Sequence, residues 1–409
     1  MKTWLILAVL LACCGASAET RHRESRFVHQ QGRYLVTADG KRLMLRGINL
    51  GNWLEPEGYM FKLEGGPQAP REIEEFFNEL VGPDEAARFW KEYRAEYITE
   101  ADIKAIRKEG FNSIRIPFHY KFFTGEPGAT GGDGFALLDR VVKWSRDAGL
   151  YVVLDMHCAP GGQTGTNIDD SYGYPWLYES EAAQLRTIAI WRTIALHYRD
   201  DPTVLGYDLL NEPIPHFPAL QQYNSKLEPL YRRITTAIRE VDRNHVVIFG
   251  GAQWDSNFKV FGPPFDQNAL YELHKYWMEP TQASIQEYVD FRERYDVPLW
   301  LGESGENTDE WVGKFTAVLE KNDIGWAFWP YKKMAATSSV VAFDKPIYWD
   351  EIVAFGAMKQ GTGNAEKRIA ARPSLEHSRA ALRDLLVKIR FENEHVNPGY
   401  LKALGMRSP

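Results

Sequence analysis

The chain has 409 residues, of which 44% are hydrophobic and 25% are charged, a composition typical of soluble globular proteins and not of disordered ones. Its formal net charge of −7 and isoelectric point near 5.9 give no reason to expect a nucleic-acid partner. The length fits one β/α barrel domain with added loops and helices.

The N-terminus has the pattern of a secretory signal peptide. Lys2 supplies a positive charge, a short apolar stretch follows, and small residues precede the expected cleavage site after Ala18, which leaves a mature domain of residues 19–409. The apolar stretch is too short to span a bilayer securely, and no later segment resembles a transmembrane helix. We therefore predict a secreted or periplasmic protein, with lipid anchoring through a lipoprotein-like box at Cys13 as the alternative.

The three cysteines predict neither a disulfide nor a metal site. Cys13 and Cys14 fall within the signal, so Cys158 alone remains in the mature chain. A lone cysteine is more often a small packed hydrophobic residue than a nucleophile. The chain lacks the CxxC, HExxH and HxH spacings of common metal sites, so we expect no metal and no other cofactor.

The first predicted elements are a hairpin, a strand and a helical insertion. Residues 27–45 alternate in hydrophobicity around Asp39-Gly40, which predicts a β-hairpin. Residues 45–49 form a first inner strand, and a long helical insertion over 72–97 follows. Thr99 and Asp102 then have the capping-box spacing of a further helix, which ends at Gly110.

From residue 113 onward, predicted strands and helices alternate. Eight short apolar strands separated mostly by helices favour a single-domain (β/α)8 TIM barrel, with the hairpin and the insertion added to it. Residues 332–372 look irregular apart from a short helix near 349–355, and residues 375–391 form an amphipathic helix expected to close the outer ring. After residues 45–49, the predicted strands are 113–117, 151–157, 204–212, 246–251, 270–276, 298–303 and 325–331, and the helices are 137–148, 182–198, 220–241, 285–295 and 310–321.

Polar and aromatic side chains gather at the ends of these strands. In a β/α barrel the C-terminal strand ends share one mouth, where catalytic residues lie. Glu212 ends the fourth strand and Glu303 the seventh, so two carboxylates face each other, as cleavage of a glycosidic bond requires. The other residues expected at this mouth are Asn49, Asn52, Trp53, Arg115, Asp155, His157, Asn211, Trp254, His274, Tyr276 and Trp329.

In their order along residues 27–391, these motifs resemble glycoside hydrolase family 5, the retaining β-glycanases with a (β/α)8 barrel. The motifs are Arg115 in Ile-Arg-Ile-Pro-Phe, His157 in Leu-Asp-Met-His, the triplet Asn211-Glu212-Pro213, His274 with Tyr276, Glu303 after Leu-Gly, and Trp329 in Trp-Ala-Phe-Trp.

The resemblance implies hydrolysis by double displacement, with Glu212 as the acid/base and Glu303 as the nucleophile. Two carboxyl groups in these roles should lie about 5–5.5 Å apart. The supporting residues that it implies are Asn211 for the sugar 2-hydroxyl, Tyr276 and Arg115 beside the nucleophile, His157 and His274 lining the central subsite, and Trp329 as its floor.

Two stretches, residues 51–57 and 155–163, resemble the exo-β-1,3-glucanases of the family. There Glu57 would bind the non-reducing-end sugar and close the cleft, which favours exo action on a β-glucan or a short β-glucoside. The loop at 163–172 and the long insertion over 55–98 depart from that subgroup, so endo action by a cellulase or mannanase stays open, as does a simply solvated pair of Glu55 and Glu57.

Two further hypotheses come from other classes of protein. A non-catalytic carbohydrate-binding barrel would keep the aromatic residues and lose a carboxylate, yet both Glu212 and Glu303 are present. A metal-dependent barrel hydrolase is disfavoured because the ligand spacings are missing.

Overall fold

The computed structural model describes residues 26–123, 132–358 and 362–407. The predicted signal peptide, with Cys13, lies outside these residues. Within the described ranges, every helix is too short or too polar to cross a bilayer.

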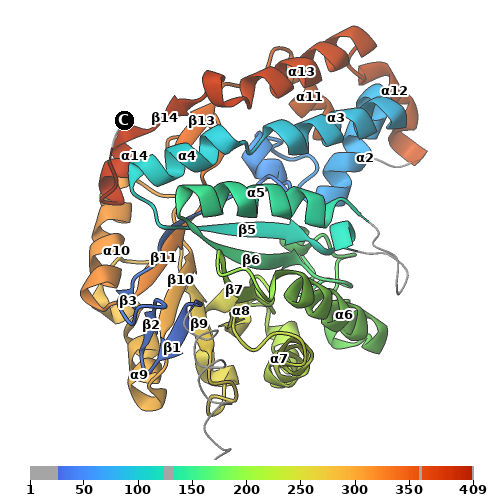
Figure 1. The fold of residues 1–409 in the computed structure, drawn as a ribbon. Coiled ribbons are helices and arrows are strands. Elements are labelled where there is room, and N and C mark those ends of the chain that lie inside the picture. The colour runs from blue at the N-terminus through green and yellow to red at the C-terminus, as the bar shows by residue number, and fades with distance from the viewer. Residues whose placement is uncertain (1–25, 124–131, 359–361, 408–409) are drawn as a thin grey trace, which may run out of the picture.

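Eight parallel strands form a closed barrel at the centre of the molecule (Figure 1). The strands follow one another in chain order, and β11 pairs with β4 to close the ring. Their residues are buried almost throughout, as is typical of parallel strands covered by helices. This confirms the predicted (β/α)8 barrel. The strands are β4 (Arg46–Asn49), β5 (Ser113–His119), β6 (Tyr151–Cys158), β7 (Val204–Asp208), β8 (Val246–Gly250), β9 (Ala269–His274), β10 (Leu299–Glu303) and β11 (Gly325–Phe328).

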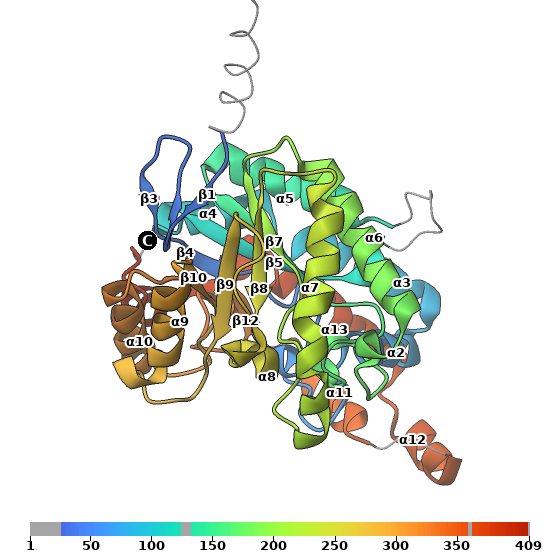
Figure 2. The same ribbon diagram turned by 90° about the horizontal axis from the view of Figure 1, so that it is seen from below.

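The predicted helices surround this barrel. Asp102 accepts the backbone N–H of Thr99 at 2.7 Å and so caps the first helix of the ring, which ends at Gly110 with φ +114°. As expected, no long helix follows β8 in the described chain, and only the single turn α8 (Ala252–Asp255) and a 3-10 helix at Phe258–Val260 precede β9. The others are α4 (Glu100–Glu109), α5 (Gly134–Ala148), α6 (Glu181–Tyr198), α7 (Asn224–Arg239), α9 (Gln286–Tyr295) and α10 (Asp309–Lys321), and Figure 2 shows α7 lying along the outside of the strands.

Four strands end earlier than the sequence predicts, β8 and β9 by one and two residues and the other two by more. β7 stops at Asp208 and not at Glu212, and β11 stops at Phe328 and not at residue 331. Leu209 and Leu210 look like strand because they are buried and apolar. Glu212 has a φ of +48°, in the left-handed region that a strand does not use, so it lies in the loop that follows the strand.

The predicted N-terminal hairpin is a three-stranded antiparallel sheet. Its strands are β1 (His29–Gln31), β2 (Tyr34–Val36) and β3 (Arg42–Leu43). Asp39-Gly40 does form the second turn, with Gly40 at φ +77°. The first turn, at Gly32 with φ +58°, was missed because one long alternating stretch hides a two-residue reversal.

The predicted helix over 72–97 is two helices, α2 (Pro70–Val81) and α3 (Pro83–Glu96). Helical periodicity continues across the break, but Gly82 and Pro83 interrupt the backbone between them. The two helices bury aromatic side chains against each other, and Phe77 stacks on Trp90 with ring centroids 5.0 Å apart.

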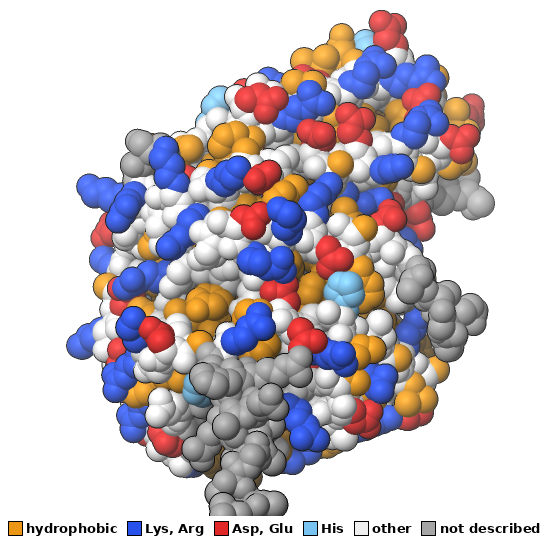
Figure 3. All heavy atoms as spheres, viewed as in Figure 1, with side chains coloured by type: hydrophobic (Ala, Val, Ile, Leu, Met, Phe, Trp, Pro, Cys, Tyr) orange, Lys and Arg blue, Asp and Glu red, His pale blue; other side chains and the backbone are white. Residues whose placement is uncertain are grey.

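The C-terminal region differs most from the prediction. Two short strands, β12 (Lys332–Met334) and β13 (Val341–Phe343), lie in the stretch predicted to be irregular. They form a small sheet with β14 (His395–Val396). α13 (Leu375–Lys388) packs on α2 and α3 and not on the barrel, whereas α14 (Pro398–Ala403) packs on α10 (Figure 1). The remaining helices are α11 (Trp349–Gly356), close to the predicted 349–355, and the peripheral α12 (Ala365–Ala371). On the face drawn in Figure 3, acidic and basic side chains are interspersed.

Candidate active site

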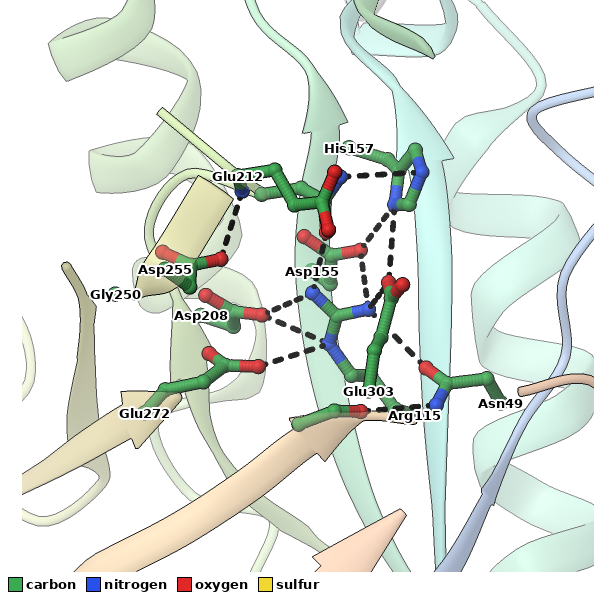
Figure 4. Close-up of polar contacts among 12 residues, drawn as sticks. Asn49, Arg115, Asp155, His157, Asp208, Glu212, Gly250, Asp255, Glu272 and Glu303 are labelled. Atoms are coloured by element: carbon green, nitrogen blue, oxygen red, sulfur yellow. Dashed lines mark hydrogen bonds and ion pairs between the residues drawn. The ribbon is translucent and has the colours of Figure 1, made fainter. Parts of the chain in front are cut away.

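The C-terminal ends of the barrel strands bring polar side chains together (Figure 4). Asn49, His274 and Glu303 are the last residues of β4, β9 and β10, and Asp155 and His157 stand near the end of β6. Arg115, predicted near a strand end, lies inside β5, which continues to His119. Because parallel strands point the same way, these residues meet at one mouth of the barrel. The predicted residues Asn211, Glu212, Trp254, Tyr276 and Trp329 lie in the segments that follow the strands and also line the pocket there.

Glu303 is held by two donors. Its Oε1 accepts a hydrogen bond from Nη1 of Arg115 at 2.5 Å, and its Oε2 accepts one from the hydroxyl of Tyr276 at 3.1 Å. The side chain is 6% exposed, so water does not replace these partners. These two contacts fix the direction in which the carboxyl group points, which suits a nucleophile.

Glu212 has a different environment. Its Oε1 lies 3.0 Å from Nδ1 of His274, and its backbone N–H donates to Oδ2 of Asp255 at 2.8 Å. No cation of lysine or arginine contacts the carboxyl group among the described residues, and its side chain is 16% exposed. The two glutamates therefore occupy environments that support different roles, because one is paired with arginine and the other with histidine.

The two carboxyl groups are close to each other. One oxygen of Glu212, one oxygen of Glu303 and a ring nitrogen of His274 all lie within 4.8 Å of one another. This short separation agrees with the spacing of about 5–5.5 Å at which one of two carboxylates attacks the sugar directly. Enzymes that place a water molecule between the carboxylate and the sugar need a spacing of about 6.5–9.5 Å.

Arg115 is the centre of the ion-pair network beneath the pocket. It is fully buried, and besides Glu303 it contacts Asp155 at 3.2 Å and Asp208 at 2.7 Å. A third carboxyl group, that of Glu272, lies 3.6 Å from its Nε. Burial alone would lower the pKa of Arg115, but the charges of Asp155, Asp208, Glu272 and Glu303 raise it well above its ordinary value, so the guanidinium stays charged.

Asn211 is fixed by two neighbours. Its Oδ1 accepts from Nη2 of Arg115 at 2.9 Å, and its Nδ2 lies 3.2 Å from Nε2 of His157. Nδ1 of His157 contacts Asp155 at 2.8 Å, and the His157 ring stacks on Trp329 with centroids 5.6 Å apart. The amide of Asn211 therefore points in one direction and keeps a second N–H for a ligand.

A pocket of about 750 Å³ lies at this mouth of the barrel, and both glutamates, Asn211 and the two histidines line it. Glu57, Tyr59 and Trp329 are among the lining residues, and the hydroxyl of Tyr59 accepts from Nε1 of Trp329 at 2.6 Å. Glu57 and Trp329 are buried. Burial raises the pKa of Glu57 to about 8, so its carboxyl group carries a proton that it can donate below that pH. Glu55 is also fully buried, so the interpretation of Glu55 and Glu57 as a solvated pair is wrong.

Exposed aromatic side chains also line the pocket. Trp254 and Phe217 meet edge to face with ring centroids 5.8 Å apart, and Trp277 is 74% exposed. Exposed aromatic rings next to polar groups offer flat faces on which sugar rings or apolar groups can stack.

Sequence reasoning missed several residues of this site. Asp208 and Glu272 lie inside apolar strands, and an acidic residue in such a strand is a usable signal, because a buried charge needs a partner. Asp255 lies on the single turn α8, and Phe217 and Trp277 come from loops, segments whose path the sequence does not reveal. Trp53, expected at the mouth, instead lies in the core and donates to the carbonyl of Arg94 at 2.9 Å.

Among the residues that the structure describes, three groups of side chains have ligand atoms close enough together for a metal ion. They share the pocket residues already described, since they are Glu55 with Glu57 and His157, Asp155 with His157 and Glu303, and Glu212 with His274 and Glu303. In the last two groups the carboxylates are already paired with Arg115 or His274. Cys158 is a buried free thiol. The expectation that the protein uses no metal stays a prediction.

Comparison with known proteins identifies the chain. The family model for cellulase (glycosyl hydrolase family 5) matches residues 76–334. The chain belongs to glycosyl hydrolase family 5. It is therefore a glycoside hydrolase, as the motifs at the strand ends predict.

The relatives and the solved structure that are similar to this chain are named for different enzyme activities. The chain is 29% identical over 360 residues to a β-xylosidase of Phanerodontia chrysosporium, an alignment that covers 78% of this chain and 74% of that protein. It is 30% identical over 236 residues to a glucan 1,3-β-glucosidase of Lachancea kluyveri, covering 53% of each. The crystal structure of an endogalactoceramidase superposes with a TM-score of 0.61 at 21% identity, over 92% of this chain and 84% of that one, and shows the same fold.

Proposed function

We propose that this family 5 hydrolase cleaves β-glucosidic bonds of a β-glucan or a short β-glucoside with retention of configuration, releasing sugar from the non-reducing end. The observation that carries the proposal is the pair Glu212 and Glu303, close together and held by different partners. The name of the glucan 1,3-β-glucosidase relative supports the substrate class.

In the first step Glu303 attacks the anomeric carbon while Glu212 gives a proton to the leaving oxygen. Arg115 and Tyr276 contact the carboxyl group of Glu303 and hold it in place for attack. In the second step Glu212 removes a proton from water, which hydrolyses the glycosyl-enzyme and restores both carboxyl groups. Asn211 has the free N–H to bind the sugar 2-hydroxyl, a contact that strengthens in the transition state.

Exo action is supported by the buried side chains that line part of the pocket. Glu57 and Trp329 are buried, Tyr59 is hydrogen-bonded to Trp329, and we infer that these three side chains stop a glucan chain at the central subsite. Glu57 instead offers a protonated carboxyl group to the hydroxyls of a terminal sugar. The aromatic side chains of Trp254 and Trp277 would receive the leaving group.

We expect the protein to release only monosaccharide from the start of the reaction. The test is a time course of products from laminarin, lichenan, carboxymethyl-cellulose and mannan. Glu57→Ala should remove part of this block, so oligosaccharides should appear among its products. Mixed oligosaccharides formed early by the unaltered protein would overturn exo action and favour an endo-acting cellulase or mannanase.

A further inference from the structure

Four fully buried carboxyl groups lie directly beneath the pocket (Figure 4). A buried carboxyl group is costly unless it is paired, so each one calls for a partner. Asp155 and Asp208 contact Arg115, on the side of Glu303. Asp255 contacts the backbone of Glu212, and Glu272 contacts His274, which in turn contacts Glu212. Neither Asp255 nor Glu272 lines the pocket.

Glu272 reaches Glu212 through one histidine. Its Oε1 lies 3.0 Å from Nε2 of His274, and Nδ1 of the same ring lies 3.0 Å from Oε1 of Glu212. A neutral imidazole has a single N–H. If Nε2 donates that N–H to Glu272, Nδ1 faces Glu212, and a second proton can be shared between Nδ1 of His274 and the carboxyl group of Glu212. This shared proton is the one that the reaction uses.

Asp255 holds the backbone of Glu212. Its Oδ2 accepts the N–H of Glu212 at 2.8 Å and lies 3.6 Å from Nε2 of His274. Glu212 has a φ of +48°, which is unfavourable for a residue with a side chain and persists only where the surroundings hold it. The hydrogen bond from Asp255 is one such restraint.

The neighbouring strands leave room for these two carboxyl groups. A Cβ atom added to Gly302 would lie 1.4 Å from Oε1 of Glu272, and one added to Gly250 would lie 1.9 Å from Oδ1 of Asp255. Only glycine fits at either position while the carboxyl groups stay in place. The barrel is therefore built around both groups.

The charged groups that face His274 come from four elements. Glu272 is on its own strand, Asp255 is on α8, Glu212 is in the loop after β7, and Glu303 of β10 lies 3.8 Å from Nδ1. Arg115 of β5 and Asp208 of β7 lie behind Glu272. Burial lowers the pKa of His274, but Glu303 and Asp255 and the hydrogen bonds with Glu212 and Glu272 raise it well above its ordinary value.

We propose that Glu272 and Asp255 are positioning residues for Glu212. Glu272 fixes the ring of His274 so that Nδ1 faces Glu212, and Asp255 fixes the backbone of Glu212. The pair of Glu212 and His274 then shares one proton, which passes to the leaving oxygen as the glycosidic bond breaks and is recovered from water in the second step. This inference rests on the proposed function, since it takes Glu212 as the acid/base.

The test uses aryl and alkyl β-glucosides whose leaving groups differ in acidity. An acidic leaving group such as 2,4-dinitrophenol departs without a proton, whereas an alkyl alcohol needs one. Glu272→Gln should lower kcat/KM for the alkyl glucoside by roughly 10- to 100-fold, part of the 10²–10⁴ that general acid catalysis supplies. The value of kcat/KM for the dinitrophenyl glucoside should stay nearly unaltered, because it reports only the first step, in which this leaving group needs no proton.

The pH profile gives a second readout. The negative charge of Glu272 helps the pair of Glu212 and His274 keep its proton, so Glu272→Gln should move the alkaline limb of kcat/KM to lower pH, by about half a pH unit or more. A uniform loss on all substrates with an unmoved alkaline limb would show that Glu272 is merely structural and would overturn the proposal.

Further variants keep the test decisive if Glu272→Gln does not fold. Asp255→Asn keeps an oxygen that can accept the N–H of Glu212 but removes a negative charge near His274, so it should lose less activity on the alkyl glucoside than Asp255→Leu, which removes both the acceptor and the charge. Equal behaviour of the two Asp255 variants would contradict the role of Asp255. Asp242→Asn is the matched control. Asp242 contacts another buried histidine, His245, at 2.6 Å, and neither of these residues lines the pocket.

Glu212→Ala separates this inference from the proposed function. If Glu212→Ala shows the dependence on the leaving group and Glu272→Gln does not, only the positioning role is wrong. If Glu212→Ala lacks that dependence, the assignment of the acid/base is itself wrong.

Discussion

Glu303→Ala is expected to abolish hydrolysis of β-glucosides, with a loss of turnover of roughly 10⁶-fold, the size seen when an enzyme loses its nucleophile. The reason is that Glu303 is the carboxylate paired with Arg115 and Tyr276, and the described part of the pocket holds no second carboxylate so paired. Turnover is measured with an aryl β-glucoside, and circular dichroism and the melting temperature show whether the variant is folded.

Azide sharpens this prediction because it can replace the lost nucleophile. It should restore turnover of an activated substrate in Glu303→Ala by entering from the face that Glu303 vacates, and the product should be an α-glucosyl azide. Glu310→Ala is the control, since this exposed carboxylate on α10 pairs with Lys314 at 2.6 Å and touches nothing in the pocket. A β-glucosyl azide from Glu303→Ala would show that the roles of Glu212 and Glu303 are reversed.

Arg115→Leu is expected to lower the free energy of unfolding by about 3–5 kcal/mol, the cost of leaving buried charges without their partner. Arg115 is fully buried and lies within 3.6 Å of Asp155, Asp208, Glu272 and Glu303. Its removal leaves these carboxyl groups to share the remaining donors. The loss is measured by unfolding in urea, and activity should fall as well because Glu303 and Asn211 lose a donor.

Two variants control for the loss of charge as such. Arg33→Leu removes an arginine whose ion pair with Glu293 is exposed, so it should change the stability by less than about 1 kcal/mol. Arg115→Lys keeps the charge but not the planar fork of donors, and should fall between the two. If Arg115→Leu were as stable as Arg33→Leu, the network beneath the pocket would not depend on this cation.

The barrel could be predicted because each of its strands is a short apolar stretch with a recognisable end. The site followed from the barrel, since residues as distant as Arg115 and Glu303 must meet if both stand at C-terminal strand ends. The predicted ends of strands and helices were less accurate where the hydrophobic pattern continues past the true end of the element. Leu209 and Leu210 look like strand, and the periodicity of residues 72–97 hides the break at Gly82.

The carboxyl groups beneath the pocket could not be placed from the sequence. Asp208 and Glu272 become partners only when the barrel closes, because β7 and β9 are separated by β8 in the ring. Asp255 depends on the path of a single helical turn. The packing of α13 on α2 and α3 was equally hidden, since an amphipathic pattern shows that a helix has a buried face and not which element covers it.

Proton NMR of the first sugar released tests the central claim most directly. If Glu303 attacks the anomeric carbon and Glu212 serves in turn as acid and base, hydrolysis of an aryl β-glucoside should release the β anomer first, and the α anomer should appear only as the sugar mutarotates. Initial release of the α anomer would mean a single displacement by water, and would contradict the double displacement proposed for Glu212 and Glu303.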